Sequence, residues 1–269
     1  MPYYYGYGFD WTYFVIVLPC ILLSLWASSS VNSTFKKYST VMSSRHITGA
    51  EAAQQVLRAN GVHGVRIERV SGNLTDHFDP KTNVIRLSDS VYNSASVGAI
   101  GVACHEAGHA VQYAENYGPI KLRAAIIPIT NIGSKLTMPL ILLGVVLGVL
   151  GNFSYVLVEL GIACFSLSLL FQLVTLPVEF NASRRAITAI KRSGILTESE
   201  QRGAQQTLKA AAMTYVAATA VALAQLLRLI LLFGGRRRRD YGNIYRPGLD
   251  NRGGFLYNLS GVKSMKNMI

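Results

Sequence analysis

Residues 136–176 read LTMPLILLGVVLGVLGNFSYVLVELGIACFSLSLLFQLVTL, and this stretch decides the fold class. Two strongly apolar runs, Leu136–Leu150 and Val156–Leu176, flank a short turn at Gly151–Tyr155. The runs approach or reach the length of about 20 residues that a helix needs to cross a bilayer. We therefore predict a transmembrane helical hairpin over residues 136–176.

The composition of the whole chain also indicates a membrane protein. Of the 269 residues, 50% are hydrophobic and 15% are charged, and the mean hydropathy is +0.29. These values exclude a disordered or fibrous chain. The formal net charge of +12 suits either nucleic acid or an anionic membrane surface. Because the apolar runs favour the bilayer, we expect no nucleic-acid partner.

A first transmembrane anchor is expected near the N-terminus. Phe9–Ala27 is apolar and about long enough to cross a bilayer. Residues 1–10 contain no Lys or Arg, whereas the first part of a secretory signal is positively charged. Residues 1–30 are therefore predicted to be an anchor that the protein retains.

A fourth apolar stretch, Ala211–Phe233, lies near the C-terminus. It is rich in Ala and contains Gln225 and Arg228, so whether it spans the membrane stays open. A basic tail, residues 234–269, follows and begins with Arg236–Arg239.

The polar segment between the anchor and the hairpin predicts a small α/β unit. Thr48 and Glu51 form a capping-box pattern at the start of a helix that extends to Ala59. Val65–Val70 and Val84–Leu87 alternate as half-buried strands do. We predict that these two strands pair as a hairpin that packs against helices.

The motif His105-Glu-Ala-Gly-His109 lies within a predicted helix, Val97–Tyr113. Residues four apart share a helix face, so His105 and His109 can bind one Zn²⁺. Glu106 is rotated by about 100° around the helix and can reach a water at the metal without being a ligand. Zinc with a neighbouring carboxylate as general base is typical of hydrolases, so the motif predicts a zinc-dependent hydrolase.

Two histidines leave a catalytic zinc site one protein ligand short, and a downstream Glu is a usual third ligand. On a continuous helix Glu115 points away from the metal, and Glu159 lies near the hairpin turn on the opposite membrane face. Glu179 follows the second arm of the hairpin, at a new helix expected to open near Pro177, on the face where the hairpin began. We therefore predict Glu179 as the third ligand. The alternative is a carboxylate that stabilises a helix N-terminus.

The distribution of Lys and Arg beside the spans predicts the orientation. About ten lie on the side of the polar segment and about five on the other side if the fourth stretch spans. The first group is Lys36, Lys37, Lys121, Arg123, Lys135, Arg184, Arg185, Lys191, Arg202 and Lys209. By the positive-inside rule, the polar segment is expected in the cytoplasm.

Several stretches together resemble the bacterial neutral zinc metallopeptidases of the YugP type, which are integral membrane proteins. They are Thr48-Gly-Ala-Glu-Ala-Ala53, Gly72-Asn-Leu-Thr-Asp-His-Phe-Asp-Pro80, Arg86-Leu-Ser88, Val102-Ala-Cys-His-Glu-Ala-Gly-His-Ala-Val-Gln112 and Leu176-Pro-Val-Glu-Phe-Asn-Ala-Ser-Arg-Arg185. The resemblance implies a zinc-dependent peptidase of the bacterial cell membrane. It also implies that His105 and His109 bind the metal and that Glu106 is catalytic.

The layout is also similar to that of the HtpX-type membrane gluzincins, whose downstream motif is Glu-aromatic-x-Ala-Asp. This similarity carries the third zinc ligand onto Glu179. The chain departs from the motif at Ser183, where those relatives have an Asp that would orient a ligand His.

The expected fold is mainly α, with multi-pass transmembrane helices and a small α/β zincin-like cytoplasmic part that holds the short hairpin and the HExxH helix. The expected parts are an N-terminal anchor (1–30), a zincin-like segment (31–135), a transmembrane hairpin (136–176), a helix with the third ligand (177–210), a fourth apolar helix (211–233) and a basic tail (234–269).

Weaker catalytic candidates lie outside the HExxH motif. His77 precedes the Val84–Leu87 strand, which we expect to be the edge strand along which a peptide lies, as in zincin folds. His77 could polarise the scissile carbonyl. A surface-loop histidine is the commoner interpretation. Arg184 and Arg185 suit either oxyanion stabilisation or anchoring beside a span.

We therefore expect a membrane zinc endopeptidase whose site lies at the cytoplasmic interface and acts on polypeptides, including membrane proteins. The rival is a catalytically silent membrane scaffold with a structural zinc. The intact Glu106 argues against the scaffold, because a structural site does not need this carboxylate. A transporter is disfavoured, because Glu159 and Arg228 are the only charged residues in the interior of the apolar stretches.

Overall fold

The computed structural model describes residues 11–148 and 152–233, which belong to one unit of the chain. The expected basic tail (234–269), residues 1–10 of the anchor and residues 149–151 of the hairpin turn lie outside the described residues.

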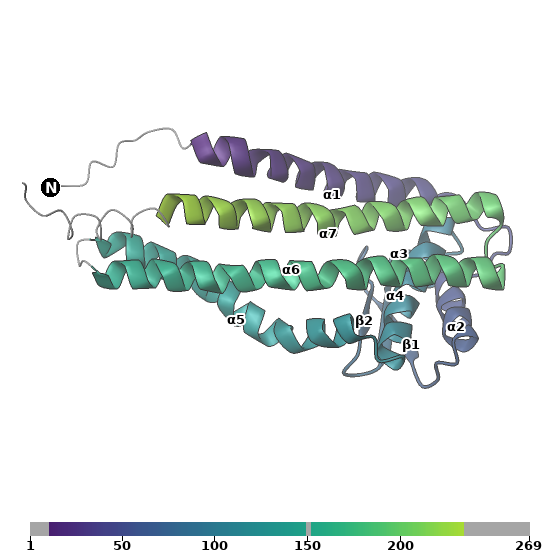
Figure 1. Ribbon diagram of the computed structural model, residues 1–269. Helices are drawn as coiled ribbons and strands as arrows, with labels where there is room; N and C mark the ends of the chain where they lie inside the picture. The colour runs from purple at the N-terminus through teal and green to yellow at the C-terminus, as the bar shows by residue number, and fades with distance from the viewer. Residues whose placement is uncertain (1–10, 149–151, 234–269) are drawn as a thin grey trace, which may run out of the picture. The chain divides into compact units, whose positions relative to one another are not determined.

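Long helices make up most of the structure (Figure 1). A π-helical turn, η1 (Tyr13–Val17), leads into α1 (Leu18–Ser39), and α5 (Gly118–Val146), α6 (Asn152–Ser193) and α7 (Glu198–Phe233) follow later in the chain. Four segments are long and apolar enough to cross a membrane: Tyr13–Ser39, Gly118–Val146, Phe153–Ser193 and Glu198–Phe233. The prediction of a mainly α, multi-pass architecture is confirmed.

The helices continue beyond the lengths expected from hydropathy. α6 has 42 residues and runs through Pro177 without a break. The prediction that a new helix opens near Pro177 is therefore wrong. Proline is tolerated within membrane helices where packing against neighbouring helices compensates for the lost backbone hydrogen bond, and α6 packs against α4, α5 and α7. A 42-residue helix is about 63 Å long, whereas the apolar core of a bilayer is about 30 Å thick. One end of α6 therefore extends out of the membrane.

Helix bounds do not coincide with the expected divisions of the chain. α5, α6 and α7 each cross one of the expected boundaries, at 135/136, 176/177 and 210/211, as a continuous helix. α5 packs on α6, α6 on α7 and α7 on α1. The polar part is therefore built partly on the same helices that enter the membrane.

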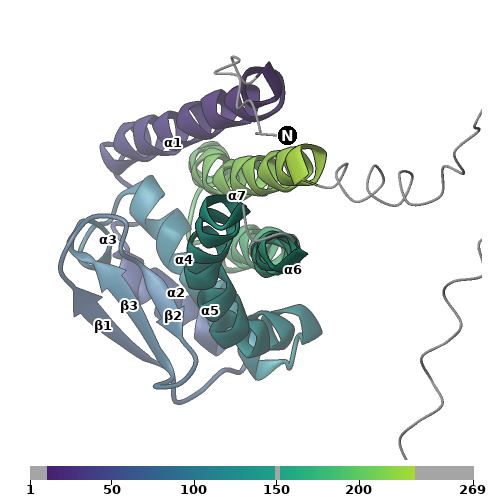
Figure 2. The same cartoon turned by 90° about the vertical axis from the view of Figure 1, so that its left-hand side faces the viewer.

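A three-stranded sheet lies beside the ends of these helices, in the order β1-β3-β2 (Figure 2). β1 (Arg66–Val70) pairs with β3 (Val84–Ser88) in parallel, and β2 (His77–Asp79) pairs with β3 antiparallel. Both predicted strands exist, but their pairing as a hairpin is wrong. The hairpin is formed by β2 and β3, because the largely buried β3 takes the central position and has a partner on each side. The expectation that Val84–Leu87 is an edge strand open to a peptide is therefore also wrong.

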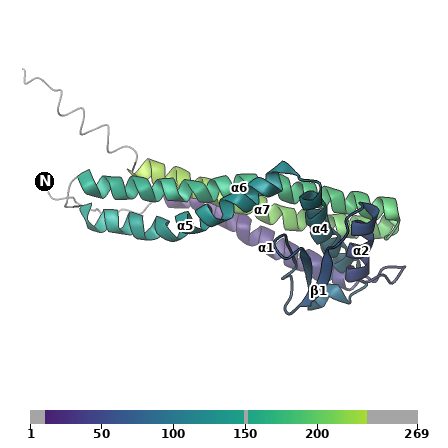
Figure 3. The same cartoon turned by 90° about the horizontal axis from the view of Figure 1, so that it is seen from below.

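Helix α4 (Val97–Ala114) carries the HExxH motif and lies between the sheet and the long helices (Figure 3). It packs against α2 (Gly49–Ala59), α6 and α7, and the short α3 (Asp89–Tyr92) precedes it. The capping box at the start of α2 is confirmed, with Thr48 Oγ1 accepting from Glu51 N and Glu51 Oε2 accepting from Thr48 N. Apolar side chains from α2, β3, α4 and α6 form the core around α4.

Three glycines let α4 approach three other helices. A Cβ atom built at Gly98 would lie 3.1 Å from the Tyr38 carbonyl carbon of α1. At Gly101 it would lie 3.4 Å from Ala204 of α7, and at Gly108 it would lie 2.8 Å from the Ala182 oxygen of α6. The contact at Gly108, between the two motif histidines, therefore sets how closely α4 can approach α6.

We expect Gly108→Ala to push α4 away from α6 and lower the free energy of unfolding by about 1–3 kcal/mol, the usual range for overpacking. Gly101→Ala is the matched control, because its Cβ would meet Ala204 at an ordinary 3.4 Å. Thermal unfolding in detergent and zinc content measure both effects. Equal behaviour of the two variants would contradict the role assigned to Gly108.

Candidate metal centre

The structure brings His105, His109 and Glu179 together at the contact between α4 and α6. One potential ligand atom from each residue lies within 4.8 Å of the others. His105 Nε2 is 3.3 Å and His109 Nε2 is 3.6 Å from Glu179 Oε2. The Glu179 side chain is 2% exposed, so its carboxylate faces the two imidazoles and not solvent.

This donor set fits zinc. Zinc takes imidazole nitrogen and carboxylate oxygen at about 2.0–2.2 Å with tetrahedral angles, which places neighbouring ligand atoms about 3.3–3.5 Å apart. The distances of 3.3 and 3.6 Å to Glu179 Oε2 are close to this spacing. Three protein ligands leave one position for water or substrate, as in catalytic zinc sites.

A hydrogen-bond network fixes the orientation of His109. The Gln112 amide nitrogen lies 2.9 Å from both the Val178 carbonyl and Asn181 Oδ1, two acceptors, and therefore donates to both. Gln112 Oε1 must then face His109 Nδ1, at 3.0 Å. Because this oxygen can only accept, Nδ1 carries the proton and Nε2 is free to bind a metal. Asn181 Oδ1 also accepts from Arg185 Nε at 2.7 Å, which fixes the amide of Asn181.

Ser183 and Arg123 position the other two residues of the cluster, His105 and Glu179. With Nε2 of His105 directed to the cluster, Nδ1 donates to Ser183 Oγ at 3.2 Å. The serine that departs from the HtpX-type motif thus supplies an acceptor for His105. Arg123 of α5 donates to Glu179 Oε1 at 2.8 Å, which leaves Oε2 for the cluster.

Glu106 lies beside the cluster and is 8% exposed. Its side chain lines a cavity together with His105 and Glu179. Burial raises the pKa of Glu106 to about 7, and the negative charge of Glu179 acts in the same direction. A carboxylate with a pKa near neutrality can both take up and release a proton at physiological pH.

The other two candidate carboxylates lie outside the cluster. Glu115 is the C-terminal cap of α4 and forms an ion pair with Arg185 at 2.7 Å. Glu159 is on α6, 20 residues and therefore about 30 Å along the helix from Glu179. Arg185 is thus engaged by Glu115 and Asn181, whereas Arg184 is exposed.

His77 lies at the start of β2 and is exposed, with Nδ1 2.8 Å from the Thr75 carbonyl oxygen. Its neighbour Asp76 lines the cavity beside Glu106. The Asp76 carboxylate accepts from Ser88 N at 2.7 Å and from Ser88 Oγ at 3.0 Å, and burial raises its pKa. A catalytic role for His77 stays a prediction.

Comparison with known proteins assigns the chain to a family. A family model described as "Putative neutral zinc metallopeptidase" matches residues 13–234, which is most of the chain. The chain belongs to this family. A relative from Bacillus subtilis (strain 168), named "Putative membrane protease YugP", is 46% identical over 218 residues, which cover 81% of this chain and 95% of the relative. No solved structure matches the chain significantly.

The sequence does not reveal which residues hold His105, His109 and Glu179 in place. Gln112 follows His109 by three residues, and this spacing on one helix face could have suggested the contact. In the sequence Arg123 is one of several cations beside a span. Asn181 and Asp76 lie in stretches that carry the family resemblance, but the sequence does not indicate their contacts, because their partners lie on other elements.

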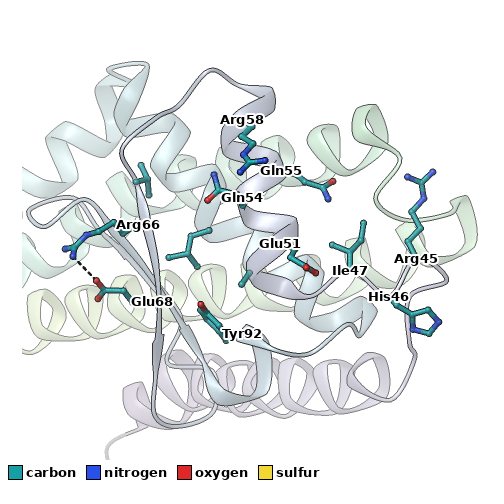
Figure 4. A pocket seen from close by; sticks show the side chains of 13 residues that line it. Arg45, His46, Ile47, Glu51, Gln54, Gln55, Arg58, Arg66, Glu68 and Tyr92 are labelled. Atoms are coloured by element: carbon teal, nitrogen blue, oxygen red, sulfur yellow. Dashed lines mark ion pairs between the residues drawn. The ribbon is translucent and has the colours of Figure 1, made fainter.

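A larger hollow, of about 870 Å³, lies between α2 and the edge strand β1 (Figure 4). Charged and polar side chains make up most of its labelled lining, and Arg66 pairs with Glu68 at 3.2 Å on one side of it. None of His105, His109 and Glu179 lines this hollow. The smaller cavity beside Glu106 is therefore the one that belongs to the metal centre.

Proposed function

We propose that the protein is a zinc-dependent endopeptidase of the bacterial cell membrane, with its site at the cytoplasmic interface. His105, His109 and Glu179 would hold the ion. The observation that carries the proposal is the convergence of these three ligand atoms within 4.8 Å, beside a buried carboxylate that faces a cavity. Its substrates would be polypeptides, including membrane and membrane-proximal proteins, and the surrounding lipid bilayer would be its other partner.

The reaction we propose uses Glu106 to move protons. Zinc bound at the cluster would supply Lewis-acid polarisation and make water a better nucleophile near neutral pH. The Glu106 carboxylate would accept the proton of the attacking water and deliver it to the leaving amine. Gln112 and Ser183 would keep each imidazole turned so that Nε2 faces the ion. Arg123 would keep Glu179 ionised and in place.

The features of the site favour an enzyme over a silent scaffold with a structural zinc. Structural zinc sites usually have four protein ligands and no open position. The cluster has three such residues, and Glu106 lies beside them on the wall of a cavity of about 250 Å³. A scaffold would need neither the cavity nor the buried carboxylate.

The test is zinc content together with hydrolysis of a casein-type substrate by the full-length protein in detergent. We expect about one zinc per chain, loss of hydrolysis after a strong chelator removes the metal, and recovery when zinc is returned. Zinc-loaded protein that stays folded but hydrolyses no polypeptide would favour the scaffold.

The count of Lys and Arg beside the spans supports a cytoplasmic site, and thiol labelling can test this orientation. Ser71→Cys and Ser199→Cys, both at exposed positions, should react with a membrane-impermeant thiol reagent only after cells are permeabilised. Phe153→Cys is the control, because Phe153 is 59% exposed and lies at the other end of α6. It should react in intact cells. All three variants need a background without Cys20, Cys104 and Cys164. The reverse pattern would contradict the orientation.

A further inference from the structure

The cavity beside Glu106 is bounded by membrane helices as well as by the metal cluster. It encloses about 250 Å³ between α1, α4, α6, α7 and the loop that precedes β2. Its polar lining residues are Asp76, His105, Glu106, Glu179, Ser183, Thr207, Thr214 and Tyr215. Most of the surface that lines it is nevertheless apolar, and its apolar residues are Val31, Phe35, Leu74, Val102, Leu208, Ala211 and Ala212.

The size and lining of the cavity suit one apolar side chain. Sites for whole small molecules usually enclose about 300–1,000 Å³, which is more than this cavity offers. Removing an apolar side chain from water into such a lining is favourable in proportion to the area buried. The carboxylates of Asp76, Glu106 and Glu179 in the lining disfavour an anionic group such as a lipid phosphate.

We infer that this cavity receives the apolar side chain of the substrate residue next to the scissile bond, and that Ala212 and Leu74 determine which side chains fit. The inference rests on the proposed peptidase function. Ala212 of α7 is 5% exposed and lines the wall, so its small side chain leaves room for a larger one from the substrate.

Leu74 has an unusual conformation at the same cavity. Its φ is +54°, in the left-handed region that bulky residues rarely adopt, and its side chain is 40% exposed. Such a conformation persists only where the surrounding structure enforces it. Two sets of hydrogen bonds hold the loop that contains Leu74. Thr75 Oγ1 donates to the Ser71 carbonyl, and Ser88 N and Oγ donate to the Asp76 carboxylate. The loop therefore holds an apolar side chain where it can cover a bound substrate residue.

The test compares cleavage of paired peptides that differ only in Leu or Ala beside the scissile bond, after cleavage sites in a peptide library are mapped by mass spectrometry. Wild type should prefer the Leu peptide. A side chain that fills a pocket changes such selectivity by about 10–200-fold per methylene-sized group. Ala212→Leu should therefore lower the Leu-to-Ala ratio of kcat/KM at least about tenfold. Ala222→Leu, on the same helix but outside the cavity lining, is the control.

A second variant covers the case in which Ala212→Leu does not fold. Leu74→Asn keeps a side chain of similar size, suits the left-handed backbone and removes the apolar cover. It should keep its stability and lose most of the preference for the Leu peptide. An unchanged Leu-to-Ala ratio of kcat/KM in a folded, active variant would overturn the inference. The inference would also be overturned if wild type retains a lipid that Ala212→Leu loses while this ratio stays the same.

If zinc-loaded wild type cleaves no peptide, the proposed function fails. If it cleaves without preferring an apolar residue, only the inference fails.

Discussion

Glu106→Gln is expected to keep about one zinc per chain and to lose hydrolysis of polypeptides by at least about 10²–10⁴-fold, the usual contribution of a positioned proton-transfer group. Gln has nearly the same shape as Glu but cannot accept a proton from water. Glu106 is buried beside the cluster, yet His105, His109 and Glu179 already provide the grouped ligand atoms. Its loss should therefore affect the chemical step and not the binding of metal.

Metal analysis and rates on the same preparation measure this effect. Glu115→Gln serves as the control, because it removes a carboxylate at the C-terminal end of the same helix, which pairs with Arg185 and not with the cluster. If Glu106→Gln loses its zinc, Glu106 is a ligand and the assignment of roles is wrong. If it hydrolyses at the wild-type rate, the proposed proton transfer is wrong.

Glu179→Gln is expected to weaken zinc binding by more than about 100-fold and to abolish hydrolysis. The figure exceeds the 10–100-fold that replacing a residue behind a ligand typically causes, because here the ligand itself changes. Gln is neutral and a poorer zinc ligand than a carboxylate. It also leaves Arg123, which now donates to Glu179 Oε1 at 2.8 Å, without an anionic partner.

Zinc content after dialysis against a mild chelator is the decisive measurement. Glu115→Gln and Glu159→Gln should both retain metal, since neither side chain belongs to the cluster. Retention by Glu179→Gln together with loss from Glu115→Gln would reverse the assignment. The third ligand would then have to come from the C-terminal end of α4.

The position of Glu179 could be predicted from the sequence because hydrophobic runs report membrane crossings directly. Two crossings return the chain to the side on which it started, so Glu179 had to end near the helix with His105 and His109. The continuity of α6 through Pro177 could not be predicted. It depends on packing against neighbouring helices, and hydropathy contains no information about that packing.

The strand pairing, and the residues that contact and orient the metal ligands, could not be predicted for a different reason. Alternation in Val65–Val70 identifies a strand but not its partner, and the parallel pairing of β1 with β3 depends on β2 occupying the other edge. Arg123 is a cation next to a span, where the positive-inside rule already accounts for Arg and Lys. Only its contact with Glu179 distinguishes it from the other basic residues.

The continuity of α6 and α7 has a consequence for how the chain could be divided. The centre takes His105 and His109 from α4, Glu179 from α6 and Arg123 from α5, while α1 and α7 wall its cavity. No cut in the sequence separates a water-soluble fragment that keeps all these parts. The membrane helices are therefore not a tether that could be exchanged for another anchor. Deleting any one of them would remove a residue of the His105, His109 and Glu179 cluster, the Arg123 that holds Glu179, or part of the cavity wall.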